Sequence, residues 1–154
     1  MTGERDQMKK ALRALVVPKI RTLGFTGSFP HFRRKHELEH QMLMFMFNKY
    51  GGSFYLEAGR LSEAEFIDLT KIWESSSKQL SVVDLTVGHC KWNRRTRLGG
   101  AEIHNNTSHC FNFSADQFQE KVSTAKPSSH YNEIAMQLIA IVDLQVEVYF
   151  AGTT

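Results

Sequence analysis

The stretch from Gln41 to Gly59 constrains the fold more than any other part of the sequence. The run Gln41–Asn48 is apolar and bounded, as a buried strand is, but methionine has little preference for strands, so a helix is the competing interpretation. Tyr50-Gly51-Gly52-Ser53 is a strong turn signal, and Phe54–Gly59 has the composition of a returning strand. Together these runs predict a β-hairpin.

Amphipathic helices are predicted at both ends of the chain. Between about Glu4 and Leu23, apolar residues recur every three or four positions and form one stripe. Pro18 cannot donate to the carbonyl four residues back, so this helix should kink there or end and restart. A second helix is predicted from about His130, and the pattern after Leu144 fits either helix or strand.

Length and composition complete the prediction of the fold class. A chain of 154 residues has the size of one domain, and 42% apolar with 23% charged residues is typical of a globular protein. We therefore predict a single α+β domain over residues 1–154. An N-terminal amphipathic helix packs on a mainly antiparallel β-sheet, and a C-terminal helix follows.

Four shorter segments have weaker patterns. Ser62–Glu65 forms a capping box that opens a helix. Leu80–Val87 alternates loosely, which predicts a strand with a bulge. Phe29–Arg33 is predicted to be an extended strand. Ser114–Gln117 is predicted to cap a short helix that continues through Phe118 and Val122.

The string His36-Glu37-Leu38-Glu39-His40 matches the H-E-x-x-H motif of zinc metalloproteases. On a helix, His36 and His40 would lie one turn apart and bind Zn²⁺, while Glu37 activated a bound water. The charged residues around the motif argue against this, because such a helix packs its outer face in the core. We predict no metal and no cofactor, and keep His36 and His40 only as the weakest candidate ligands.

Two features bear on cellular location. The cysteines are Cys90 and Cys110, which are expected to be free thiols in a reducing compartment. The first residues, Met1–Asp6, lack the apolar stretch of a signal peptide. The sequence has no uninterrupted run of about 18 apolar residues, so no membrane span is predicted. We expect a cytoplasmic protein without a membrane partner.

The densest positive segment is Lys91-Trp92-Asn93-Arg94-Arg95-Thr96-Arg97, and Arg33-Arg34-Lys35 is the second. If residues 91–97 are extended, Arg95 and Arg97 share one face, and Trp92 and Arg94 share the other. Guanidinium pairs clamp phosphate or carboxylate groups, and aromatic side chains stack on bases. The alternative is a solvated strand whose arginines pair with carboxylates such as Glu57.

Short motifs in a shared order resemble a known family. They are Pro18 late in the first helix, Gly24-Phe25, Phe32-Arg33, the run Lys49–Tyr55 after an apolar strand, and Arg95–Gly99. They resemble the bacterial family of domains of unknown function numbered 4304. The resemblance implies that Lys35–Gln41 is a turn into a strand, which makes the H-E-x-x-H string accidental. It implies no activity, and its recurrent arginines mark Arg33, Arg95 and Arg97.

These observations favour a non-enzymatic binding protein, immunity-like or adaptor-like, that acts through a protein partner. The candidate binding residues are Arg33, Trp92, Arg94, Arg95 and Arg97. The net charge of +3 argues against a strongly basic nuclease as the target. The alternative is a nucleic-acid-binding domain that uses the Arg94–Arg97 segment, and a metal-dependent hydrolase is a third hypothesis. Homo-oligomerisation is left open.

Overall fold

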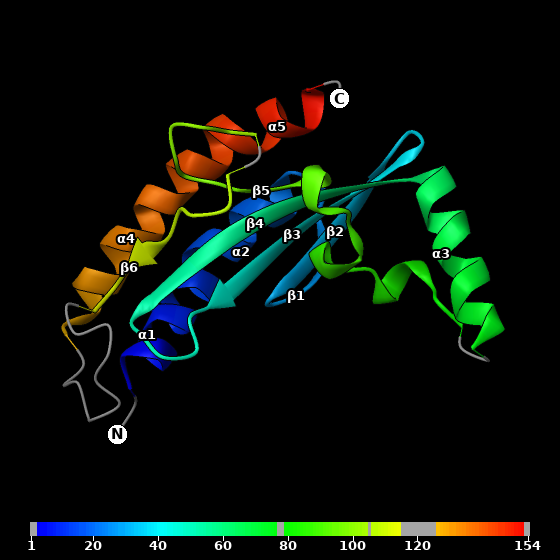
Figure 1. Ribbon diagram of the computed structural model, residues 1–154. Coiled ribbons are helices and arrows are strands. Elements are labelled where there is room, and N and C mark those ends of the chain that lie inside the picture. Colours follow the sequence, from blue (N-terminus) through cyan, green and yellow to red (C-terminus); the bar gives the residue numbers. More distant parts are fainter. Residues whose placement is uncertain (1–2, 77–78, 105, 115–125, 153–154) are drawn as a thin grey trace.

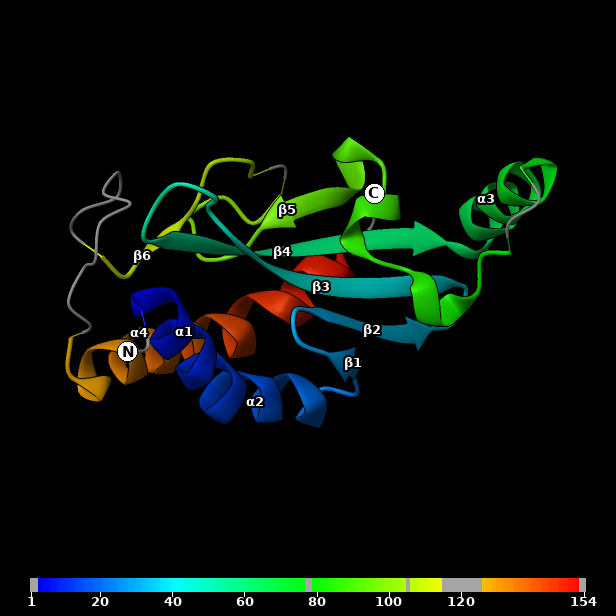
Figure 2. The same cartoon turned by 90° about the horizontal axis from the view of Figure 1, so that it is seen from below.

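The computed structural model describes residues 3–152 except 77–78, 105 and 115–125. One face of an antiparallel sheet packs against the N-terminal and C-terminal helices (Figure 1). Figure 2 shows these helices below the sheet and the connecting segments above it. We call the face turned away from the N- and C-terminal helices the open face. The predicted α+β fold, with a helix at each end of a mainly antiparallel sheet, is confirmed.

The sheet has the strand order β1-β2-β3-β4-β5, and β6 pairs with β4. The strands are β1 (Thr26–Ser28), β2 (His31–His36), β3 (Glu39–Phe47), β4 (Ser53–Ser62), β5 (Arg95–Arg97) and β6 (Phe111–Asn112). The predicted hairpin is β3–β4, with Met44 opposite Glu57, so the helical interpretation of residues 41–48 is wrong. Pro30 lies in the turn before β2, not in the strand.

The N-terminal helix changes its winding before Pro18. It runs as α1 (Glu4–Ala11), a π-helical segment η1 (Leu12–Val16) and α2 (Val17–Thr22). Pro18 stands at the start of α2, where its missing N–H costs least. The chain stays helical through Pro18, so the predicted end and restart is not observed, and the change of winding is the π-helical segment before the proline.

The C-terminal helix consists of α4 (Ser128–Ile141), the π-helical segment η5 (Val142–Val146) and α5 (Glu147–Ala151). Residues after Leu144 are thus helical. By length and composition alone, Ser128–Ala151 is the one helix among the described residues apolar enough to cross a membrane. Core helices of globular proteins pass the same test, and this helix buries Leu138, Val142 and Val146 in the core.

The main core lies between the sheet and the terminal helices. Its largest side chains are aromatic, and Phe25, Phe32, Phe45 and Phe54 are almost fully buried. Alternation along each strand sends Phe45 and Phe54 to the helix-covered face and their neighbours to the open face. Most of the phenylalanines are accounted for by packing.

Part of the open face is covered by α3 (Glu63–Ser75) and the segment 79–94, whose apolar side chains pack with Met42 and Met44. The predicted capping box is present: Ser62 Oγ accepts from the Glu65 amide at 3.1 Å, and the Glu65 side chain accepts from the Ser62 amide at 2.9 Å. In Figure 1, α3 projects from the end of the sheet. Leu80, Leu85, Val87 and Cys90 pack with open-face methionines in a smaller second core.

The predicted strand over Leu80–Val87 is wrong. Short 3-10 helices stand there instead: η2 (Val82–Asp84), η3 (Val87–His89) and η4 (Trp92–Arg94). Local side-chain hydrogen bonds compete with strand pairing, since Ser81 N and Oγ donate to Asp84 Oδ2 at 3.2 and 3.0 Å. The predicted helix after Ser114 lies outside the described residues.

Candidate functional site

The structure brings three of the five candidate residues to the open face. The strand register places Arg33 opposite Met42, Met42 opposite Gly59, and Gly59 opposite Arg95, so these residues form one row across the sheet. Arg97 follows two residues later on the same face, as alternation along β5 predicts. The row explains how residues 62 positions apart in the sequence share a surface.

Arg95 joins the segment 79–94 to the sheet. Its Nε and Nη2 donate to the carbonyl oxygens of Cys90 and Gly88, each at 2.8 Å. Its Nη1 lies 4.0 Å from Glu57 Oε1. The ion pair with Glu57, which the sequence offered as the alternative to ligand binding, is therefore present. Arg95 is a structural residue in this conformation, because its donors are occupied within the fold.

Trp92 is exposed, and Arg95 packs against its ring. Its side chain is 76% exposed, while the Arg95 guanidinium carbon lies 4.5 Å from the centre of the indole ring. Such cation–π contacts hold both groups in register. The predicted pairing of Trp92 with Arg94 on one strand face is wrong, because both residues belong to the 3-10 helix η4.

Arg94 is engaged inside the protein. Its Nη2 lies 3.6 Å from Glu65 Oε1 and 4.0 Å from Glu39 Oε1, and its carbonyl oxygen accepts from the Tyr149 hydroxyl at 2.7 Å. The same Glu39 carboxylate accepts from Arg60 Nε at 2.6 Å. Arg94 thus ties the sheet edge to α3 and the C-terminal helix.

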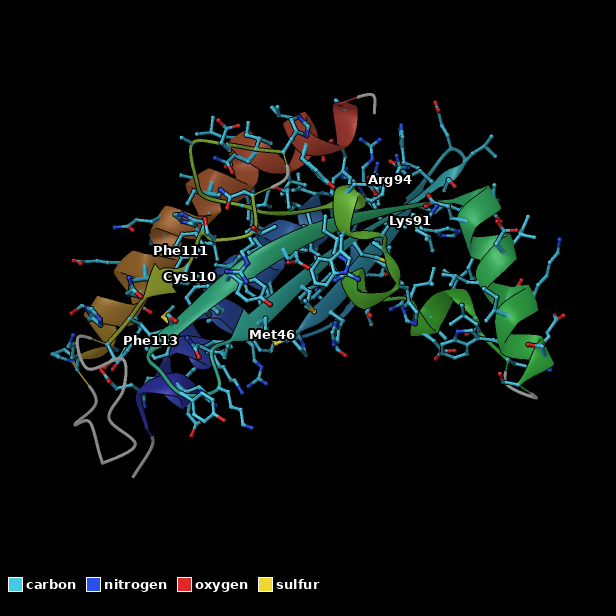
Figure 3. All side chains as sticks on the ribbon, in the orientation of Figure 1. Met46, Lys91, Arg94, Cys110, Phe111 and Phe113 are labelled. Atoms are coloured by element: carbon cyan, nitrogen blue, oxygen red, sulfur yellow. The ribbon has the colours of Figure 1, made fainter. Side chains whose placement is uncertain are left out.

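Arg97 lies at the other half of the open face, away from α3. Its guanidinium carbon is 3.7 Å from the centre of the Tyr55 ring, and its Nη1 is 3.4 Å from Cys110 Sγ. Figure 3 shows Cys110 and Met46 over this half, and Lys91 and Arg94 over the half nearer α3. Burial and the Glu57 carboxylate raise the pKa of Tyr55, although Arg97 opposes this shift.

Glu57 is the buried carboxylate of the open face, with 8% of its surface exposed. Burial raises its pKa more than the nearby Arg95 and Arg97 lower it. Tyr55, Glu57 and Cys110 were not predicted as site residues. The alternation of β4 was a signal for Tyr55 and Glu57, but Cys110 reaches Arg97 only through the fold.

A substitution of Glu57 tests this balance. The pKa of Glu57 in the folded protein lies above the usual value of 4.5, so the folded protein binds this proton more tightly than the unfolded chain does. The free energy of unfolding therefore falls as the pH rises from 4.5 through the folded pKa. We expect Glu57→Gln to be at least as stable as the wild type at pH 7 and to lose less stability between pH 4.5 and 7. Urea unfolding across this range measures both. A wild-type stability that rises more steeply with pH than that of E57Q would contradict the assignment.

The H-E-x-x-H string forms a hairpin turn. His36 ends β2, Glu37 occupies the turn with a φ of 53°, and His40 lies in β3. His36 pairs with Glu39 and His40 with Lys35, so the two imidazoles lie on opposite faces. The zinc-protease geometry is therefore ruled out for these residues. His40 is buried, with its Nε2 3.0 Å from Glu63 Oε2.

In the part of the chain that the structure describes, no group of three or more His, Cys, Asp or Glu side chains is arranged to hold a metal. His89 Nδ1 accepts from the Thr86 amide at 2.9 Å, which gives that histidine a structural role. Cys90 and Cys110 are free thiols, as expected.

The sheet is backed by the terminal helices on one face and is partly open on the other, which defines a small α+β domain. The family model described as Domain of unknown function (DUF4304) matches residues 16–140. The chain belongs to this family, as its motifs predicted, and the implied turn into a strand near Lys35–Gln41 is present. Neither the curated proteins nor the solved structures contain a match to the chain.

Proposed function

We propose that this chain is a non-catalytic binding domain, immunity-like or adaptor-like, that engages a protein partner through the surface centred on Trp92. The observation that carries the proposal is the indole itself, which is 76% exposed on the segment 79–94 that packs over the open face. Tryptophan is enriched among the residues that dominate protein interfaces. A large apolar side chain left in water gains most when a partner covers it.

The way Trp92 is held supports the same function. Arg95 lies under the indole and is itself bonded to two carbonyl oxygens, so the ring is presented on a fixed base. A side chain that is already ordered loses little conformational entropy on binding. The geometry therefore suits an anchor residue that enters a pocket of a partner.

Charge indicates the chemistry of that partner. Arg33 lies on the same face and takes part in none of the ion pairs found among the described residues. Lys91 next to Trp92 is 72% exposed along its side chain. With a net charge of +3, these groups favour a partner surface that is acidic around an apolar pocket.

The contacts disfavour nucleic acid as the main ligand. Arg94 and Arg95 pair with carboxylates and carbonyl oxygens of the chain, and their side chains are only 18% and 15% exposed. A phosphate clamp needs guanidinium donors that face the solvent. A cytoplasmic setting in a bacterial cell fits the two thiols, neither of which forms a disulfide.

Replacing Trp92 with alanine is expected to abolish capture of the partner. Tagged wild type, Trp92→Ala and Leu144→Ala are used as bait in a lysate of the source organism, and co-eluting proteins are quantified by mass spectrometry. Leu144 is a matched control, since it is 71% exposed on the C-terminal helix. We expect one near-stoichiometric protein with the wild type and L144A, and a loss of about tenfold or more with W92A. Capture of nucleic acid only, of nothing, or of equal amounts by W92A would contradict the proposal.

A further inference from the structure

A pocket of about 310 Å³ opens beside Arg97, and nothing in the preceding proposal uses it. Its lining includes Met46, Phe47, Phe54, Tyr55, Arg97 and Cys110. The volume is at the lower end of the range for small-molecule sites, which are mostly apolar with a few convergent polar groups. We propose that this pocket binds a small molecule made of an apolar, preferably aromatic, body and one carboxylate, with the carboxylate at Arg97.

No carboxylate among the described residues lies within ion-pair distance of the Arg97 guanidinium, although Glu57 is near enough to feel its charge. None of the ion pairs found among the described residues includes Arg97. Glu57 stands opposite Arg97 in the strand register, but Arg95 Nη1 is the cation paired with that carboxylate, at 4.0 Å. The cluster of Glu57, Arg95 and Arg97 therefore has one positive charge in excess. A bound anion would neutralise it.

The hydrogen bonds of Arg97 lead to the same conclusion. Its Nη1 donates to the weak acceptor Cys110 Sγ, at 3.4 Å. Its Nε is buried and has no hydrogen-bond partner within the described part of the chain. A buried charged donor without an acceptor costs free energy that a ligand acceptor would recover. Guanidinium matches a carboxylate with two parallel hydrogen bonds.

The remaining lining suits the apolar body of such a ligand. Met46 and Tyr55 face each other across β3 and β4 on the open face, and Met46 is 40% exposed. Thioether and aromatic groups give favourable contacts to an aromatic ring. The Tyr55 ring is already held by the Arg97 guanidinium at 3.7 Å. The pocket thus offers a cation and an apolar surface side by side.

Cys110 provides a built-in reporter for occupancy. The loop before it is shaped by Asn106, whose Oδ1 accepts from the amides of Ser108 and His109 at 3.0 and 3.1 Å. Cys110 is partly exposed, whereas Cys90 is buried and burial raises its pKa to about 12. A thiol reagent therefore modifies Cys110 in the native protein and spares Cys90.

The experiment measures the rate of Cys110 modification by a disulfide reagent in the full-length native protein. The probes are 3-phenylpropionate and its neutral amide, 3-phenylpropanamide, which has the same shape without the charge. We expect the carboxylate to slow the reaction saturably, by about tenfold at ten times its Kd. The amide should need an at least about tenfold higher concentration than the carboxylate to give the same protection. Equal protection by both probes, or protection by neither, overturns the proposal.

Two variants locate the anion site. Arg97→Gln should remove the preference for the carboxylate over the amide, and Arg33→Gln, on the same face of β2, should keep it. A preference retained in R97Q overturns the assignment to Arg97. The wild-type comparison of the two probes stands even where a variant folds poorly. Because the readout needs no protein partner, its failure is distinct from failure of the Trp92 proposal.

Discussion

Replacing Phe54 with alanine is expected to lower the free energy of unfolding by about 3–5 kcal/mol. Phe54 is fully buried on β4. Its ring centre lies 5.3 Å from that of Phe47 and 5.2 Å from that of Phe111, both in stacked arrangements. Truncation removes the burial of the ring and opens a cavity lined by the other rings. The ring also joins the hairpin to β6, so its loss should weaken that pairing.

Urea unfolding of the wild type and Phe54→Ala measures this effect, with Tyr50→Ala as the control. Tyr50 is also aromatic and lies in the turn of the same hairpin, but it is 62% exposed. Its truncation should change stability by less than about 0.5 kcal/mol. A loss below about 1.5 kcal/mol for F54A would mean that Phe54 is not a central core residue.

Arg95→Ala has the second-largest expected effect, a loss of about 2–4 kcal/mol in the free energy of unfolding. The substitution removes two hydrogen bonds to carbonyl oxygens and the charge beside the buried Glu57. It also frees the segment that covers Cys90. The Cys90 Sγ packs closely on Gly59, because a Cβ added to Gly59 would lie 2.8 Å from this sulfur. A second thiol per molecule should therefore become reactive in R95A.

A double-mutant cycle separates the two contributions of Arg95. If the buried charge of Glu57 causes part of the loss, Arg95→Ala combined with Glu57→Gln recovers about 1 kcal/mol relative to the sum of the single losses. The remainder then belongs to the carbonyl contacts. An R95A protein as stable as the wild type, with Cys90 still protected, would show that Arg95 does not fix the segment 79–94.

The sequence carried enough information for the elements whose signals are local. The hairpin followed from its glycine turn, and the helix α3 (Glu63–Ser75) followed from the capping box at Ser62. The family motifs also predicted the turn at Lys35–Gln41, against the helical interpretation of the H-E-x-x-H string. In each case neighbouring residues determine the backbone conformation, so local patterns suffice.

The candidate site depended on contacts that local patterns do not report. Leu80–Val87 has the apolar content of a strand, yet Ser81 and Asp84 close a 3-10 turn within it. In the sequence, Arg95, whose donors are occupied, looks like Arg97, whose Nε has no hydrogen-bond partner among the described residues. The approach of Cys110 to Arg97 depends on the loop between β5 and β6. Tertiary packing decides which arginines are structural.

Trp92, packed on Arg95, is proposed to anchor a protein partner, and the affinity of the isolated pair measures its contribution. The captured partner is purified and titrated calorimetrically with wild type, Trp92→Ala and the exposed control Leu144→Ala. We predict that W92A weakens binding by at least about 2 kcal/mol, roughly thirtyfold in Kd, without changing the unfolding free energy, and that L144A binds like the wild type. Equal affinities of W92A and the wild type would contradict the claim.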